Sequence, residues 1–219
     1  MKIINMHSLC LAAAAAWLFW SPAAKADPAD ASDPQVDMQI DDQPGYQPSA
    51  EEEQLAGPFE RQIVFFRTTE APGTIVVHTA ERYLYLVQPN NRAIRYGIGV
   101  GRDGFQWAGI RKIIQKQEWP DWRPPPEMIQ RQPYLPRFMA GGPGNPLGAR
   151  ALYLGKTVYR IHGTNQPSTI GKFVSSGCIR LLNEDVEDLY GRVKVGTRVT
   201  VRPGVGAAAA SASAAPAAR

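Results

Sequence analysis

Residues 159–165 read YRIHGTN, and residues 175–181 read SSGCIRL. The two segments place one histidine and one cysteine, His162 and Cys178, in the same part of the chain. A thiolate is a strong nucleophile, and a histidine is the usual base that generates it near neutral pH. Residues 157–161 favour a strand that leads directly to His162. Together the segments predict a nucleophilic active site.

The chain between His162 and Cys178 must fold back if the two side chains are to meet. Gly163, Gly171 and Gly177 make this return feasible, because glycine adopts backbone conformations that other residues avoid. Gly177 also lets the backbone approach a substrate carbonyl closely. We therefore predict that the N–H groups of Gly177 and Cys178 stabilise an oxyanion.

Residues 1–26 have the features of an export signal. Lys2 supplies a positive charge, residues 9–20 form an uncharged run, and residues 24–26 read AKA, a small-x-small cleavage site. The run is shorter than the roughly 20 apolar residues of a membrane span. We expect a cleaved signal, no membrane span after cleavage, and a location in the periplasm or cell envelope. An uncleaved N-terminal anchor is the alternative.

Signal cleavage would remove Cys10 and leave Cys178 without an intramolecular disulfide partner. Exported proteins usually hold their cysteines in pairs. An unpaired thiol is a liability in an oxidising compartment, so a reactive role for Cys178 is favoured over a buried, inert thiol.

The net charge of +4 conceals a strong asymmetry. Residues 27–60 contain 10 acidic residues and no Lys or Arg, whereas residues 61–219 contain 22 basic and 10 acidic residues. A basic exported domain favours an anionic extracellular partner such as wall polymer over nucleic acid, with a generic solvated surface as the alternative.

Composition divides the rest of the chain into three parts. Residues 27–60 are acidic and rich in proline, which predicts a disordered linker. Residues 61–203 form the predicted domain. Residues 204–219 consist almost entirely of Ala, Ser, Gly and Pro and are predicted to be a disordered tail.

The domain is predicted to be mainly β. β-Branched and aromatic runs indicate a meander of antiparallel strands, followed by a closing strand: residues 74–79, 83–87, 93–100 and 193–201. A helix is predicted after Leu182, with Asn183 as its N-cap. Prolines in residues 104–150 argue against a long helix or a central strand there. The aromatic residues of that segment form either a lid over a groove or a compact loop.

The motifs His-Gly-Thr-Asn and Ser-Ser-Gly-Cys-Ile-Arg, followed by a helix, resemble the L,D-transpeptidase catalytic domain. The resemblance covers roughly residues 74–202. It implies a β-sandwich or meander with one or two short helices, an acyltransferase that acts on peptidoglycan stem peptides, and sensitivity to carbapenems. It implies neither a metal nor an organic cofactor.

By this resemblance, Cys178 is the nucleophile and His162 its base. The thiolate displaces D-alanine from a tetrapeptide stem and forms a thioester, and the amine of a second stem's diaminopimelate resolves it as a 3→3 cross-link. Gly163 would orient His162 through its carbonyl, and Ser175 would hydrogen-bond within the loop. Arg180 is a candidate for binding a substrate carboxylate, with a salt bridge to Glu184 or Asp185 as the alternative. Four further assignments to substrate binding are made: Ser175, Ser176, Thr164 and Asn165.

One position departs from the common pattern. Many members have Ser-His-Gly-Cys, whereas this chain has Ser176 in place of the second histidine. We interpret that position as one that tunes the pocket. The other histidine of the domain, His78, is predicted to be structural.

Other functions remain open at this stage. Water as the acceptor would make the protein an L,D-carboxypeptidase or hydrolase, and a protein amine would make it an enzyme that attaches an outer-membrane protein to the wall. A non-catalytic wall-binding module is a further alternative. A zinc site is disfavoured, because His162 and Cys178 lack further ligands nearby.

Overall fold

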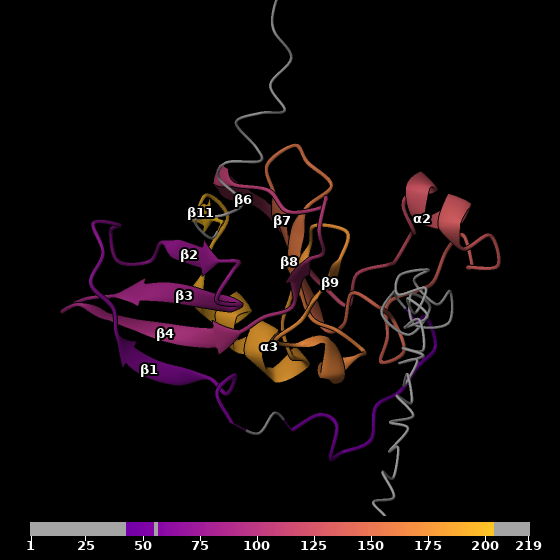
Figure 1. The fold of residues 1–219 in the computed structure, drawn as a ribbon, viewed down its shortest axis with the longest axis horizontal. Helices are drawn as coiled ribbons and strands as arrows, with labels where there is room; N and C mark the ends of the chain where they lie inside the picture. Colours follow the sequence, from indigo (N-terminus) through magenta and orange to yellow (C-terminus); the bar gives the residue numbers. More distant parts are fainter. Residues whose placement is uncertain (1–42, 55–56, 204–219) are drawn as a thin grey trace, which may run out of the picture. The chain divides into compact units, whose positions relative to one another are not determined.

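A computed structural model describes residues 43–54 and 57–203. The predicted signal, the first part of the predicted linker and the alanine-rich tail lie outside these residues. Within them the fold is mainly β, as the sequence predicts, with two α-helices, α2 (Pro126–Arg131) and α3 (Asn183–Arg192). The strands join in a nine-stranded sheet and a two-stranded sheet (Figure 1).

The first half of the large sheet is the predicted meander. β2 (Ile75–His78), β3 (Tyr83–Gln88) and β4 (Arg92–Gly97) pair antiparallel in sequence order, and β1 (Gln62–Phe65) adds an edge strand to β4. The closing strand β11 (Arg198–Arg202) pairs parallel to β2. Consecutive residues of β2 and β3 are buried, so both faces of this part of the sheet are covered.

β6 (Gly109–Glu118) joins the two halves of the sheet. Its first residues pair with β11, its last residues pair with β7 (Arg150–Leu154), and the register shifts between Ile113 and Gln115. The prediction of no central strand in residues 104–150 is therefore wrong. The prolines of that segment begin at Pro120, after the strand ends, so they remove no ladder hydrogen bond from β6.

The second half of the sheet carries the two motifs. β8 (Arg160–His162) pairs antiparallel with β7, and β10 (Ile179–Arg180) pairs parallel with β8. A parallel neighbour requires a crossover connection. Here the crossover contains a 3₁₀ turn at Pro167–Thr169 and β9 (Phe173–Ser175), which pairs with β5 (Val100–Gly101).

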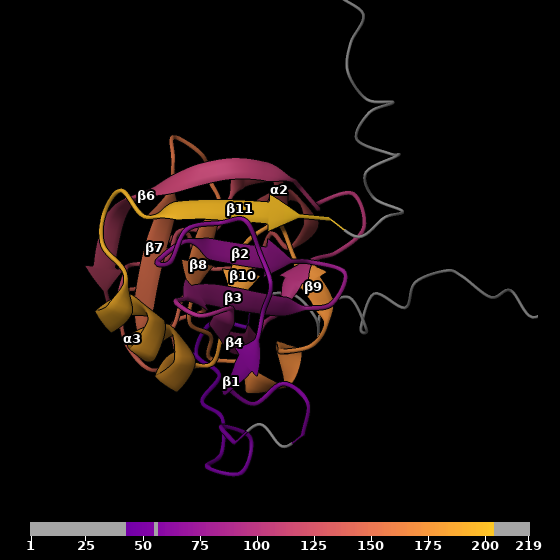
Figure 2. The same ribbon diagram turned by 90° about the vertical axis from the view of Figure 1, so that its left-hand side faces the viewer.

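One hydrophobic core lies between the two halves of the curled sheet. Figure 1 shows β2, β3 and β4 running in a different direction from β7 and β8, and Figure 2 shows the curl from β11 to β1. Side chains from both halves and from α3 share this core: Ile75, Val77, Leu84, Leu86, Tyr96, Ile113, Leu152, Leu154, Ile161, Ile179, Val186 and Leu189. Burial of these apolar groups holds β8 and β10, and therefore both motifs, at fixed positions.

The N-terminus of α3 differs from the prediction. Leu182 occupies the N-cap position, and no side chain caps the helix. Asn183 is the first helical residue, and its Oδ1 accepts a hydrogen bond from the Ala149 N–H at 2.9 Å. The amide thus ties the helix to the chain that enters β7.

Residues 119–149 form a compact loop that packs on itself, which was one of the two predicted alternatives. Trp122, Met128, Leu135 and Leu147 form a separate buried cluster that includes one residue of α2. The buried Asn145 side chain donates to the carbonyls of Pro120, Met139 and Ala140 within 3.3 Å. The segment therefore has a core of its own beside the sheet.

Residues of the predicted linker, which ends at residue 60, contact the domain. The Asn165 Nδ2 group donates to the carbonyls of Gln43 and Tyr46, at 2.8 and 3.1 Å. Phe59 accepts a hydrogen bond from the Gly97 N–H and packs its ring at 5.3 Å from that of Tyr83. Composition did not predict these contacts. The backbone of this polar segment is bound by residues that lie far away in the sequence, such as Asn165.

Gly171, in the crossover between the two motifs, offers a test of this packing. It has φ of +81°, and an added Cβ would lie 2.5 Å from Phe59 Cε2. We expect Gly171→Ala to lower the unfolding free energy by about 2–4 kcal/mol, through the positive φ and overpacking together. Urea unfolding of the full chain measures this change.

Gly196→Ala is the matched control, because Gly196 has φ of +92° and nothing within 4 Å of an added Cβ. It should cost about 1 kcal/mol. In a Phe59→Ala background, which lacks the ring that the new Cβ would meet, Gly171→Ala should also cost about 1 kcal/mol of unfolding free energy. Equal costs for the two glycines in the presence of Phe59 would contradict the described packing.

Candidate active site

The parallel pairing of β8 and β10 positions the histidine relative to the cysteine. His162 lies opposite Arg180, and Ile161 lies opposite Ile179. Cys178 precedes β10 directly, so it stands two residues before Arg180 and its side chain is expected on the same face as those of Arg180 and His162. The tertiary fold thus brings the two motifs side by side.

The His162 imidazole is buried and oriented by the backbone. It is 3 % exposed, and its Nδ1 lies 2.6 Å from the Gly163 carbonyl oxygen. A carbonyl only accepts hydrogen bonds, so Nδ1 carries the proton and Nε2 holds a lone pair. This is the geometry predicted for Gly163, and it leaves His162 with the tautomer that a general base needs.

Burial keeps His162 neutral. Desolvation, with the positive charge of Arg180 as the second cause, lowers its pKa from 6.5 to about 3. Hydrogen bonding to the Gly163 and Leu147 backbone opposes this shift without reversing it. Near neutral pH the ring is therefore a proton acceptor and not an imidazolium.

The loop before Cys178 is held by its own hydrogen bonds. The Ser175 hydroxyl donates to the Cys178 carbonyl at 2.5 Å and accepts from the Gly177 N–H at 3.2 Å. Ser175 thus bonds within the loop, as predicted. The Gly177 N–H faces this hydroxyl, so its predicted role in an oxyanion hole does not hold in this arrangement.

Aromatic residues brace the same loop from outside. The Trp107 indole donates to the Gly177 carbonyl at 2.8 Å and stacks on Tyr159, with ring centroids 4.8 Å apart. An added Cβ at Gly177, which has φ of +104°, would lie 2.6 Å from the Tyr159 ring. Glycine is therefore required there. No sequence pattern predicted these contacts of Trp107 and Tyr159.

Cys178 is partly exposed. Its Sγ lies 3.8 Å from the carbonyl oxygen of Val158, whose side chain is 66 % exposed. Partial exposure is what a thiol that attacks an external substrate requires.

Four of the residues predicted to bind substrate are buried: Ser175, Arg180, Thr164 and Asn165. Arg180 is 3 % exposed, and its predicted alternative partner Asp185 pairs with Arg61 at 3.3 Å. Thr164 accepts from the Gln166 N–H within its own turn, and Asn165 holds the carbonyls of Gln43, Tyr46 and Gly144. Their burial argues against direct substrate contact. Arg180 instead acts on the pKa of His162.

Ser176 and His78 complete the predicted set. The Ser176 hydroxyl accepts from Arg131 Nη2 of α2 at 3.5 Å, so this position lies at the junction with residues 119–149. His78 pairs with Glu81 at 3.1 Å and packs against Tyr85, in keeping with a structural role.

Residues 43–54 and 57–203 also hold a groove away from this site. This groove of about 520 Å³ lies between β1, β4 and α3 and includes neither His162 nor Cys178. Those residues contain no cluster of three metal-binding side chains. No helix among them is long and apolar enough to cross a bilayer.

Comparison with known proteins identifies the family. Residues 72–201 match the family described as YkuD, the L,D-transpeptidase catalytic domain. The chain belongs to this family. The match begins just before β2 and ends within β11, so it includes every strand after β1, both helices and both motifs.

Two curated relatives come from Escherichia coli strain K12. The probable L,D-transpeptidase ErfK/SrfK is 42% identical over 136 residues, which cover 58% of this chain and 43% of that protein. The probable L,D-transpeptidase YbiS is 41% identical over 135 residues, covering 57% and 43%. The match thus spans less than half the length of these relatives.

A solved structure from Brucella melitensis, of a probable carnitine operon oxidoreductase caia, is 48% identical and covers 68% of this chain and 97% of that one. The TM-score between the two structures is 0.45. The sequence match over residues 72–201 is what shows the L,D-transpeptidase family.

Proposed function

We propose that this protein is an exported L,D-transpeptidase that cross-links peptidoglycan stem peptides through a thioester on Cys178. One observation carries the proposal. His162 is buried and neutral, its Nδ1–H is held by the Gly163 carbonyl, and its strand β8 pairs with β10, which directly follows Cys178. Family membership and the basic surface of the domain support the choice of an anionic wall polymer as substrate.

The reaction follows from these roles. His162 Nε2 takes the proton from Cys178 Sγ, and the thiolate attacks the carbonyl carbon between the third and fourth residues of a tetrapeptide stem. The C–N bond breaks, the His162 proton passes to the departing amine, and D-alanine leaves. An acceptor amine then attacks the thioester and gives up a proton through His162. A new amide forms and the Cys178 thiol is restored.

The products of a defined muropeptide test this proposal. We expect the mature protein, incubated with a tetrapeptide-bearing muropeptide, to release D-alanine and form 3→3 cross-linked dimers, both detected by mass spectrometry. Tripeptide without dimers would identify water as the acceptor and the enzyme as an L,D-carboxypeptidase. Stem joined to an added protein amine would identify the anchoring reaction. Release of no D-alanine at all would contradict the proposal.

A further inference from the structure

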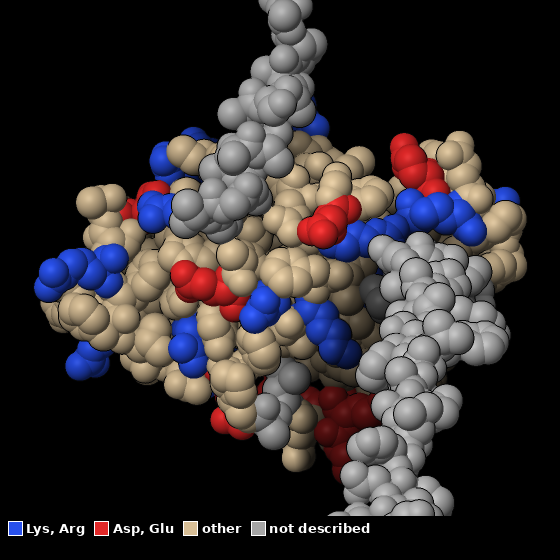
Figure 3. Space-filling view, viewed as in Figure 1, with Lys and Arg blue, Asp and Glu red and all other residues tan. Residues whose placement is uncertain are grey.

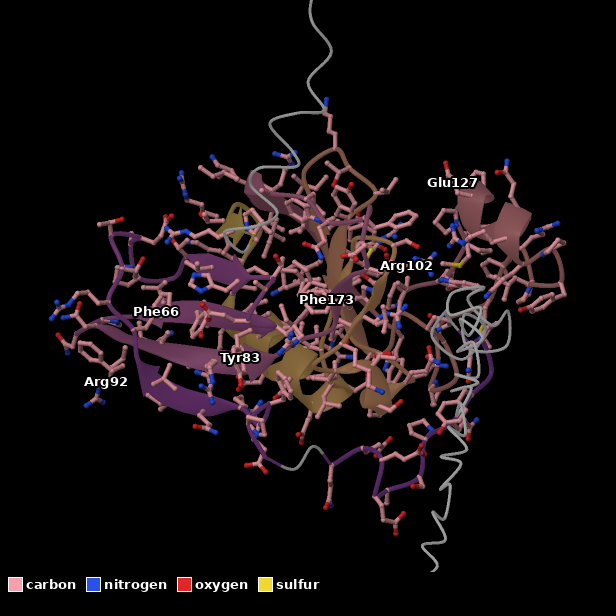
Figure 4. The ribbon with its side chains drawn as sticks, in the orientation of Figure 1. Phe66, Tyr83, Arg92, Arg102, Glu127 and Phe173 are labelled. Atoms are coloured by element: carbon pink, nitrogen blue, oxygen red, sulfur yellow. The ribbon has the colours of Figure 1, made fainter. Side chains whose placement is uncertain are left out.

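Two arginine side chains lie near a single aromatic ring beside the loop that carries Cys178. The Arg102 guanidinium lies 5.1 Å from the Phe105 ring centroid, and that of Arg131 lies 5.7 Å from the same centroid. Figure 3 shows Lys and Arg side chains gathered between the body of the domain and α2. In Figure 4, Arg102 lies on the side of the domain nearer to α2, which carries Glu127.

Arg102 is fixed to the catalytic loop through the backbone. β5 pairs with β9 at Gly101 and Ser175, and the Arg102 N–H donates to the Ser175 carbonyl at 3.0 Å. The Phe105 N–H closes a turn onto the Arg102 carbonyl at 2.9 Å. The Phe105 carbonyl lies against Gly101 and Gly177. Arg102 and Phe105 therefore keep a fixed position relative to Cys178.

Arg131 reaches the same place from α2. Its Nη1 donates to the Glu127 carbonyl one turn earlier, at 3.4 Å, and its Nη2 donates to the Ser176 hydroxyl at 3.5 Å. The side chain is exposed. This guanidinium therefore contacts Ser176, which stands two residues before Cys178 in the chain.

We propose that Arg102 and Arg131 form a clamp that binds the terminal carboxylate of the donor stem, an inference that rests on the proposed function. A guanidinium is the side chain best suited to hold a carboxylate through two parallel hydrogen bonds. In a tetrapeptide donor this carboxylate belongs to the leaving D-alanine, one residue or about 4 Å beyond the scissile carbonyl. Arg180, the residue expected from sequence to bind a carboxylate, is buried, whereas Arg131 is exposed.

The test compares two donors that differ only at the C-terminus, D-alanine carboxylate and D-alanine carboxamide. We expect the ratio of kcat/KM for carboxylate over carboxamide to fall about tenfold to a hundredfold in Arg131→Gln and in Arg102→Gln, mainly through KM. Arg131→Lys should retain part of the ratio, since it keeps the charge and loses the planar fork.

Arg123→Gln is the matched control. It removes one positive charge from the same segment, where Arg123 lies 4.6 Å from the Phe138 ring centroid. The ratio should be unchanged in this variant. An equal fall of the ratio in Arg123→Gln would show that the effect comes from net charge alone, and it would overturn the clamp.

Binding to the Cys178→Ala protein separates the clamp from the proposed function. Turnover by the wild type with an unchanged ratio in Arg131→Gln and Arg102→Gln would overturn the clamp and leave the proposed function standing. Absence of turnover, with Cys178→Ala binding the carboxylate peptide more tightly than the carboxamide and losing this preference with Arg131→Gln, would support the clamp alone. Equal affinities for the two peptides would overturn it.

Discussion

Replacing Cys178 with alanine should abolish D-alanine release from a tetrapeptide donor, a loss of at least about four orders of magnitude. The reason is that no other group supplies the nucleophile in the proposed reaction. Intact mass after incubation with the donor, or with a carbapenem, should show an acyl adduct on the wild type and none on the variant. Cys178 is the only cysteine that the structure describes, so the adduct has one expected site.

Val195→Ala serves as the control for Cys178→Ala. It removes a small part of an exposed side chain in the turn between α3 and β11 and should keep both adduct and turnover. Because Cys178 is partly exposed, its replacement should leave thermal unfolding nearly unchanged. A persistent adduct on a folded Cys178→Ala protein would assign the nucleophile to another residue.

Replacing His162 with glutamine should lower kcat/KM by about two to four orders of magnitude, because the variant lacks the group that takes the thiol proton. The adduct should still form, slowly. Alkylation of Cys178 by iodoacetamide should then rise about tenfold per pH unit up to the ordinary thiol pKa near 8.5. His78→Gln makes the same chemical change at the Glu81 pair and should leave alkylation unaltered.

The pH profile of the wild type checks the environment of His162. Burial and Arg180 lower the pKa of His162 to about 3, so the ring is neutral and able to accept a proton throughout pH 5–7. Activity that requires the neutral ring should be retained down to about pH 5 and lost as the pH falls toward 3. A solvated histidine with pKa 6.5 would lose about twentyfold in activity between pH 7 and 5. An inflection near 6.5 would contradict the buried, neutral base.

The sequence was informative about those positions of the site where the proposed chemistry requires a particular residue type. Cys178 and His162 were predicted as the catalytic pair because a single unpaired thiol with a nearby histidine has few explanations in a protein that is expected to be exported. The roles of Gly163 and Ser175 followed from the family resemblance, and the structure places both as expected. The substrate-binding set was less accurate, since residue type does not reveal burial. Thr164, Asn165 and Arg180 are all turned into the domain.

The fold shows the same division. Local alternation of β-forming residues predicted β2, β3 and β4, and helical spacing predicted α3. β6 was missed because its Gln, Lys and Arg residues do not alternate clearly with apolar ones, and only Ile113 of its 10 residues is buried. Its strand identity depends on pairing with β11 and β7, which lie far away in sequence.

By itself the sequence predicted the family and the mainly-β class, which are confirmed, and it supplied the hypothesis of the nucleophile and its base. These predictions depend on residue type and short-range periodicity. The tertiary structure decided which residues share a surface. It set Arg180 beside His162 in the interior, brought residues 43–46 onto Asn165, and carried Arg131 of α2 to Ser176. These contacts join segments distant in the chain, and only the packing of the folded core determines such distances.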